Sequence, residues 1–178
     1  MFLETERLIL RKFTEDDFAG YCAFVMDPER NRMMGNRDLP DEAAARELFD
    51  WLMENERRFY AIVYKESGKV IGELTVCALP PPVAELPALQ GKTGAAFSFS
   101  IARDYRRQGL MFEAVRTTIQ RLLYEEGMDF VNAGYFDFNE ASGALQKKLG
   151  FTHLLTHSFS LEEGGEQFTT IDNIIWRE

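Results

Sequence analysis

Apolar residues follow two different periods along the stretch from Thr93 to Glu126. Residues 95–101 are bulky and aromatic, which is typical of a buried strand. Further along, apolar side chains recur at helical spacing at Met111, Phe112, Val115, Ile119, Leu122 and Leu123. Between these two patterns lies the short basic segment 106–111, which contains one glycine. The pattern therefore predicts a buried strand that turns tightly into a long helix.

The remaining chain alternates between the same two periods. Apolar runs predict further strands at residues 2–13, 59–64, 70–78, 130–136, 151–157 and 167–176. Helical spacing and capping residues predict helices at 14–27, 41–57 and 139–149, the second with Ala44, Leu48, Trp51 and Leu52 on its apolar side. Residues 29–39 are expected to form a loop or short helical turn, 79–92 a proline-rich loop, and 162–165 a turn. This order indicates a mixed α/β fold in which two central strands joined by a helix are parallel and the hairpins are antiparallel.

Bulk properties narrow the class of protein. A chain of 178 residues is expected to form a single domain, residues 1–178. The net charge of −9 argues against general nucleic-acid binding and is explained either by solubility or by attraction of a cationic partner. No apolar run is long enough to span a bilayer, and the first residues do not resemble a secretory signal. The two cysteines, Cys22 and Cys77, have no metal-site spacing, so we expect a reducing, cytoplasmic setting and no metal.

The turn before the long central helix has the properties of an anion site. The first N–H groups of a helix have no partner within the helix, and the helix dipole favours negative charge there. Gly109 allows a backbone geometry that other residues resist and lets a ligand approach closely. A phosphate or diphosphate is the ligand best suited to such a turn.

The segment Tyr105–Met111 resembles the acyl-CoA pyrophosphate loop of the GNAT (Gcn5-related) N-acetyltransferases, Gln/Arg-x-x-Gly-x-Gly/Ala. Arg106 and Gly109 match the pattern, whereas Met111 stands where glycine or alanine is usual. The resemblance implies that acetyl-CoA is bound by the residues of this turn, Arg106, Arg107, Gln108, Gly109, Leu110 and Met111. Met111 is expected either to narrow the diphosphate site or to point into the core.

A second segment resembles another signature of the same family, Asn-x-x-Ser followed by Leu-Gly-Phe. Asn139 and Ser142 lie one helical turn apart, ahead of Leu149-Gly150-Phe151. The resemblance implies that both contact the pantetheine arm of acetyl-CoA, although Asn139 is also a good helix N-cap, and the two roles are compatible. The opening segment 5–11 and the hairpin segment 69–73 also resemble the family, the first of them its ribosomal-protein alanine N-acetyltransferase branch. The implied fold has a central mixed, mostly antiparallel sheet with flanking helices and a splayed parallel strand pair.

Acetyl transfer from a thioester to an amine needs a base for the amine, a donor for the oxyanion and an acid for the leaving thiolate. For the thiolate we nominate Ser142, with Tyr135 as a second candidate. The backbone N–H at Ser100 or Ile101 is the family-like donor to the oxyanion. Glu73 is the nominated base, acting through water, although it could equally be an exposed or paired strand carboxylate. Asp137 is the other carboxylate expected near the site.

These observations predict an acetyl-CoA-dependent N-acetyltransferase acting by direct attack. Its expected acceptor is a primary amine, either a peptide N-terminal α-amine or a small molecule. One alternative is a GNAT fold that binds CoA without transferring the acetyl group, which Met111 favours. Another is a protein-interaction subunit that uses its acidic surface. The acceptor and the formation of a homodimer stay open, and no nucleic-acid or membrane partner is expected.

Overall fold

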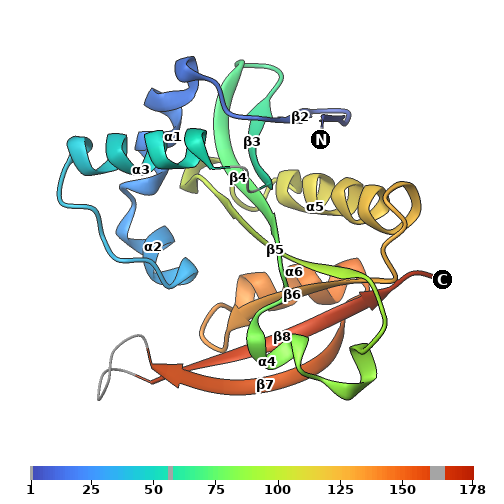
Figure 1. Ribbon diagram of the computed structural model, residues 1–178. Coiled ribbons are helices and arrows are strands. Elements are labelled where there is room, and N and C mark those ends of the chain that lie inside the picture. Colours follow the sequence, from blue (N-terminus) through green and yellow to red (C-terminus); the bar gives the residue numbers. More distant parts are fainter. Residues whose placement is uncertain (1, 56–57, 161–166) are drawn as a thin grey trace. The chain divides into compact units, whose positions relative to one another are not determined.

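The computed structural model describes residues 2–55, 58–160 and 167–178. Among these residues, eight strands form one hydrogen-bonded sheet in the order β1-β2-β3-β4-β5-β6-β8-β7 (Figure 1). The strands are β1 (Leu3–Glu4), β2 (Leu8–Arg11), β3 (Arg58–Tyr64), β4 (Lys69–Cys77), β5 (Gly94–Ile101), β6 (Phe130–Phe136), β7 (Thr152–Ser160) and β8 (Gln167–Trp176). The helices are α1 (Phe18–Val25), α2 (Pro28–Met34), α3 (Glu42–Glu54), α4 (Pro81–Ala84), α5 (Leu110–Gln120) and α6 (Glu140–Leu149).

The strand directions confirm the predicted fold class. Strands β1 to β4 pair antiparallel with their sequence neighbours, and so do β6 with β8 and β8 with β7. Strands β5 and β6, joined through α5, are parallel. Their register covers only three residue pairs, from Gly94 opposite Phe130 to Ala96 opposite Asn132, although both strands continue further. The sheet is therefore mixed and mostly antiparallel, with one parallel pair.

The chain divides into two compact units. Unit 1 consists of Met1–Val76 and Phe99–Thr118, and unit 2 of Cys77–Ser98 and Ile119–Glu178. The two units alternate along the sequence, because β4 and β5 each pass from one to the other. The expectation of a single domain stays a prediction.

Unit 1 has an aromatic core beneath its N-terminal helices. The rings of Phe13 and Tyr21 meet edge to face at 5.6 Å, and Phe49 lies 5.1 Å from Tyr21. The predicted apolar side of α3 is confirmed at Leu48 and Leu52, which belong to the core or pack against it, and is wrong at Trp51. The buried residues are Ala45, Phe49 and Leu52, spaced four and three apart, whereas Trp51 is 43% exposed. Both sets form a single stripe of a helix with 3.6 residues per turn, and the buried stripe is displaced around the helix from the predicted one.

Two further expectations for unit 1 need correction. The opening strand is broken into β1 and β2, because the chain reverses between Thr5 and Leu8, where the backbone N–H of each residue bonds to an oxygen of the other. The expected loop or short turn at 29–39 contains the helix α2, which starts at Pro28 with Asp27 as its N-cap and ends at Gly35. Proline at the first helical position after an aspartate cap is a favourable helix start. The predicted end of α3 near Arg57 lies outside the described residues.

Unit 2 has different helices on the two faces of its strands. Neighbouring residues of a strand point to opposite faces. Asn173 on β8 bonds to Gln146 of α6, whereas the adjacent Ile174 packs in a buried cluster with Val83 of α4. The proline-rich segment 79–92 is therefore a packed cover of the strands and contains two short helical turns. The turn expected at 162–165 lies outside the described residues.

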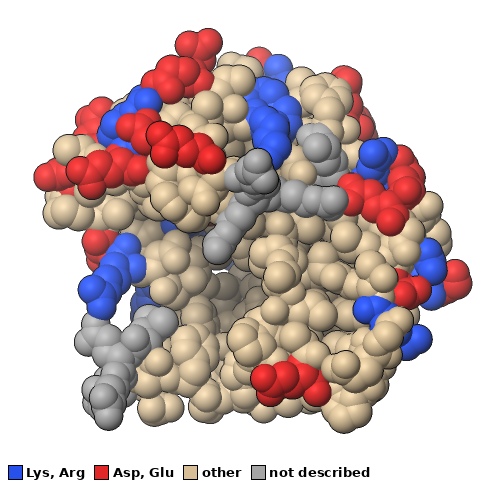
Figure 2. Space-filling model, in the orientation of Figure 1, with Lys and Arg blue, Asp and Glu red and all other residues tan. Residues whose placement is uncertain are grey.

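Negative charge gathers on the helices of unit 1. Figure 2 shows acidic side chains over the region of α1 and α3. The exposed acidic residues of α3 and of the turn before α1 include Glu15, Asp16, Glu42, Glu47 and Glu54. Within the described residues, none of the helices has the length and apolar character that would be required to cross a membrane.

Gly72 on β4 allows a close approach to β5, and this gives a first prediction. A Cβ at Gly72 would lie 2.3 Å from the Ser100 carbonyl oxygen, which belongs to the backbone and cannot rotate away. We expect Gly72→Ala to lower the free energy of unfolding by about 1 to 3 kcal/mol, as overpacking does, in chemical denaturation. The control is Gly68→Ala, where nothing lies within 4 Å of the new Cβ and only the left-handed backbone (φ +67°) is strained. Unchanged stability of Gly72→Ala would contradict the prediction.

Candidate active site

The turn that leads into α5 contains two residues with positive φ, Arg107 at 60° and Gly109 at 78°. The Gly109 carbonyl accepts a hydrogen bond from the Glu113 N–H at 3.1 Å, so the helix starts directly after the glycine. Apart from its chain neighbours, a Cβ at Gly109 would meet Arg7 Nη2 at 3.5 Å, and no other atom of the described residues lies within 4 Å of it. The first-turn N–H groups of α5 have no carbonyl to bond inside the helix, so the turn can accept an anion.

The two arginines of this turn differ in their surroundings. Arg106 lies against the start of α2, where Nη1 is 3.1 Å from a Glu29 oxygen and Nη2 is 3.4 Å from an Asp27 oxygen. Its Nε donates to the Ile101 carbonyl at 3.3 Å. Arg107 is exposed, so it is the more accessible cation of the pair. The departure from the family pattern, Met111, is half-buried in the first turn of α5.

Glu73 lies in a buried polar cluster of unit 1 with Ser100 and Arg30. The Arg30 guanidinium forms an ion pair with Glu73 Oε1 and donates through Nε to Ser100 Oγ at 3.2 Å. Ser100 Oγ also donates to Glu73 Oε1, at 3.4 Å. Arg30 and Glu73 are 5% and 8% exposed. The structure therefore brings Glu73 and Ser100 together, and one carboxylate oxygen of Glu73 is held by two donors.

The sequence reasoning did not identify Arg30. The sequence feature that could have located Arg30 is Asp27-Pro28-Glu29, which predicts a helix start with Arg30 in the first turn. A buried, paired arginine holds its partner carboxylate in place through charge-assisted hydrogen bonds. Removal of only one partner would leave an unpaired charge in the interior, which typically costs about 3 to 5 kcal/mol.

In unit 2, Asn139 caps α6 and Ser142 follows in its first turn. The Asn139 side-chain oxygen accepts the Ser142 N–H at 3.2 Å, so the capping interpretation is observed directly. Ser142 Oγ accepts a hydrogen bond from Gln146 Nε2 at 3.2 Å, and Gln146 Oε1 accepts one from Asn173 Nδ2 at 2.9 Å. Because its oxygen accepts from Gln146, the Ser142 hydroxyl proton can be donated elsewhere.

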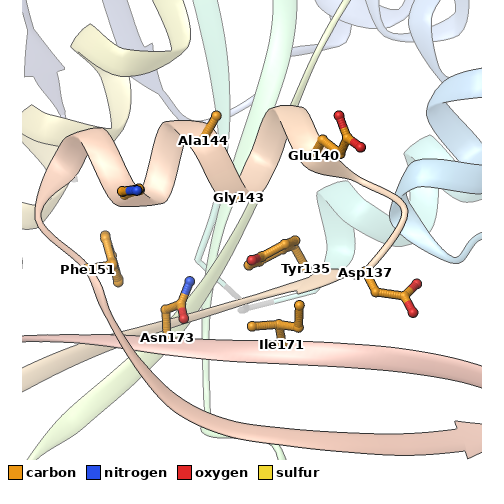
Figure 3. Close-up of a pocket in the computed structure, with 9 residues that line it drawn as sticks. Tyr135, Asp137, Glu140, Gly143, Ala144, Phe151, Ile171 and Asn173 are labelled. Atoms are coloured by element: carbon orange, nitrogen blue, oxygen red, sulfur yellow. The ribbon is translucent and has the colours of Figure 1, made fainter.

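Tyr135 lies beside the first turns of α6. A Cβ at Gly143 would be 2.9 Å from the Tyr135 hydroxyl oxygen, so only glycine lets the helix approach this ring. A pocket of about 470 Å³ opens here, and Figure 3 shows Tyr135 and Asn173 reaching from their strands toward the helix. Asp137, the second carboxylate candidate, and Glu140 lie at one end of the pocket. The pocket therefore combines an aromatic hydroxyl with two acidic side chains and one basic side chain, Lys147.

The opposite face of these strands holds a buried carboxylate. Asp172 is 2% exposed, accepts a hydrogen bond from Asn132 at 3.3 Å, and lies 3.3 Å from His157 Nδ1. Burial raises the pKa of Asp172, and the Asn132 hydrogen bond and the His157 charge lower it only in part. Within the described residues, no group of three or more His, Cys, Asp and Glu side chains is placed to hold a metal ion.

Comparison with known proteins identifies the class. The sequence profile of the acetyltransferase (GNAT) domain matches residues 7–152, which is most of the chain. The "Uncharacterized N-acetyltransferase p20" of Bacillus licheniformis is 26% identical over 153 residues, covering 84% of this chain and 81% of that protein. By class the protein is thus an acetyltransferase. The chain belongs to the GNAT family, and membership implies acetyl-CoA as the acetyl donor.

Solved structures share the fold. A GNAT-family acetyltransferase from Bacillus anthracis superposes with a TM-score of 0.84 at 16% identity, covering 99% of both chains. The ribosomal-protein-S5-alanine acetyltransferase of Vibrio fischeri gives 0.69 at 20% identity, covering 100% of this chain and 97% of that one. Spermidine N-acetyltransferase of Vibrio cholerae, solved with CoA and spermine, gives 0.75 at 12% identity, covering 97% of each. These similarities support the fold and do not single out the ribosomal-protein branch.

The raised pKa of Asp172 predicts that the Asp172→Asn substitution increases the free energy of unfolding in a pH-dependent way. A carboxyl group with a raised pKa in the folded state stabilises the fold below its unfolded pKa of about 4, and this contribution is lost as the pH rises through the folded pKa. Asparagine does not ionise, can still accept from Asn132, and can donate to His157. We therefore expect the variant to gain stability relative to the wild type as the pH rises from about 4, and then to keep a constant advantage. Urea unfolding at several pH values measures this difference, and the exposed Asp137→Asn is the control. A difference independent of pH would contradict the prediction.

Proposed function

We propose that this protein transfers an acetyl group from acetyl-CoA to a primary amine, either a peptide N-terminal α-amine or a small-molecule amine, by direct attack. The observation that supports this most strongly is the Gly109 turn, which leaves open space beside the backbone at the start of α5. The turn fits a diphosphate because it combines first-turn N–H groups with the exposed Arg107. Gln108, Leu110 and Met111 supply the neighbouring backbone.

For the leaving thiolate we assign Ser142 as proton donor, with Tyr135 as the second candidate. When the carbon–sulfur bond breaks, the electron pair stays on sulfur and takes the Ser142 hydroxyl proton, and Ser142 regains a proton from the attacking nitrogen, which must lose one to become the amide. The hydrogen bond from Gln146 to Ser142 Oγ supports this role, because it occupies the oxygen and leaves the proton available. Asn139 holds the start of α6 by its cap and is assigned to the pantetheine arm.

For the amine we keep Glu73 as the proposed proton acceptor, acting through water. Its Oε1 is held by Arg30 and Ser100, so Oε2 is the oxygen assigned to this task. The amine must lose its proton before it attacks, since an ammonium ion has no lone pair. The backbone N–H at Ser100 or Ile101 is assigned as the donor to the developing oxyanion.

The acceptor is proposed to be cationic before it reacts. The chain carries a net charge of −9, and acidic side chains gather on α1 and α3 (Figure 2) and at the pocket beside α6. Such charge attracts an ammonium group at long range. The spermidine and ribosomal-protein enzymes of this fold offer two kinds of amine to test. The same acidic surface favours the alternative of a module that docks a basic protein.

Acetyl-CoA binding tests the proposed diphosphate turn. We expect Gly109→Trp to weaken binding by about 100-fold or more in calorimetric titration, because the indole fills the open space and strains the left-handed backbone. Gly91→Trp is the matched control, since Gly91 also has positive φ and is exposed, with nothing within 4 Å of a Cβ. Equal affinity of Gly109→Trp and wild type would remove the site from this turn.

Loss of the Ser142 hydroxyl should slow the reaction without weakening donor binding. We expect Ser142→Ala to lower kcat by about 10- to 100-fold, at or below the low end for general-acid groups because Tyr135 or water can substitute in part. The affinity for CoA is expected to change little, and Ser158→Ala, an exposed serine on β7, serves as control. A normal kcat for Ser142→Ala would assign the proton to another group.

Thiol release across a panel of peptides, polyamines and aminoglycosides separates the enzyme from its alternatives. Release with any amine supports the transferase. CoA binding without release favours a binding module. A stable basic partner that is insensitive to CoA favours the interaction subunit.

A further inference from the structure

We propose that Arg7 is a positioning residue that fixes the Gln108–Gly109 turn to the start of α5. The proposal rests on the function proposed above, because the turn is the assigned diphosphate site. Arg7 lies just ahead of β2, and its Nη1 donates to the Gln108 carbonyl at 3.0 Å across 101 residues of sequence. Among the described residues, and apart from the chain neighbours of Gly109, its Nη2 is the only group within 4 Å of a Cβ built at Gly109. Arg7 therefore contacts the turn directly on the side where the glycine leaves space.

The second anchor of Arg7 is Glu113, in the first turn of α5. Arg7 Nε donates to Glu113 Oε2 at 2.8 Å, Nη2 lies 2.7 Å from the same oxygen, and the Arg7 backbone N–H donates to Oε1 at 2.8 Å. One guanidinium thus joins the turn and the helix that follows it. Only arginine carries enough donors in a fixed plane for both tasks.

Thr5 completes the arrangement. Its hydroxyl donates to Glu113 Oε1 at 2.5 Å and accepts the Leu8 N–H at 2.9 Å, so the reversal between β1 and β2 aims Thr5 and Arg7 at one carboxylate. Burial raises the pKa of Glu113, but the hydrogen bonds from Thr5 and Arg7 outweigh it and leave the pKa below its usual value. The carboxylate is therefore charged at neutral pH.

The negative charge of Glu113 gives Arg7 a second role in anion binding at the turn. A free carboxylate in the first turn of α5 would repel a diphosphate bound at the same helix end. The ion pair with Arg7 neutralises Glu113, so the turn keeps its attraction for an anion. Arg7 thus acts on the site both by holding its backbone and by cancelling a local negative charge.

Arg11, the last residue of β2, provides a matched control close to Arg7 in the chain. It forms a comparable two-point ion pair with Asp17, at 2.6 and 2.9 Å, and touches no residue of the Gln108–Gly109 turn in the contacts of the described chain. The side chains of Arg7 and Arg11 are 39% and 28% exposed. Arg7→Gln and Arg11→Gln therefore each remove one paired arginine, but only the first releases the turn.

The experiment compares both variants with wild type in acetyl-CoA affinity and in hydrogen exchange of the amides from Gln108 to Phe112. We expect Arg7→Gln to weaken binding by about 10- to 100-fold, the loss of one charge-assisted anchor, and to speed exchange in the turn. Arg11→Gln should change affinity by less than about 3-fold. With S-acetylpantetheine, which lacks the diphosphate, KM should be the same for wild type and Arg7→Gln.

The outcomes separate this inference from the proposed function. If wild type binds acetyl-CoA and Arg7→Gln binds it equally well, the positioning role is overturned while the transferase proposal stands. If wild type does not bind acetyl-CoA, both fall. If Arg7→Gln does not fold, Arg7→Lys replaces it. Lysine can pair with Glu113 but cannot hold both anchors, so wild-type affinity in that variant would overturn the proposal.

Discussion

The candidate donor site depends on one backbone constraint, the reversal that places Gly109 directly before the first turn of α5. A helix start presents donors only if the preceding chain turns away from it, and a left-handed residue accomplishes this in one step. Gly109 has the required φ of 78° and no Cβ to cover the exposed N–H groups. The surrounding side chains of unit 1 serve this turn, since Arg106 ties it to α2 and Arg7 ties it to α5. The proposed anion site therefore depends on backbone geometry, and side chains hold that geometry in place.

Most of the fold followed from local patterns. Strands β6 and β8 and the Asn139 cap of α6 were predicted at the residues where they occur, because alternation and capping act over a few positions. The apolar side of α3 was predicted only in part, since several overlapping stripes are consistent with its composition and only packing selects one. The break between β1 and β2 was also missed, because the Thr5–Leu8 hydrogen bonds leave no trace in hydropathy.

The candidate site was predictable in part. Gly109 and Asn139 were found because a helix start requires particular residue types nearby. The side chains that pair with the nominated residues were not predicted. These are Arg30, which pairs with Glu73, and Gln146, which bonds to Ser142 and to Asn173. Arg30 and Asn173 each lie on another helix or strand than the nominated residue, and a single sequence does not show which distant polar residues meet. Glu73, which was nominated as the base, thus proves to be a carboxylate whose Oε1 is paired with Arg30.

The tie between Arg7 and Gln108 also bears on how the protein acquires its binding turn. Bringing Arg7 and Gln108 together closes a loop of about a hundred residues, which costs chain entropy before the hydrogen bond can stabilise the turn. Contacts of such long range tend to form slowly and late in folding. The Gln108–Gly109 turn should therefore be unable to bind the proposed diphosphate early in folding. Transplanting this short motif alone to the start of another helix would not transfer diphosphate binding with it.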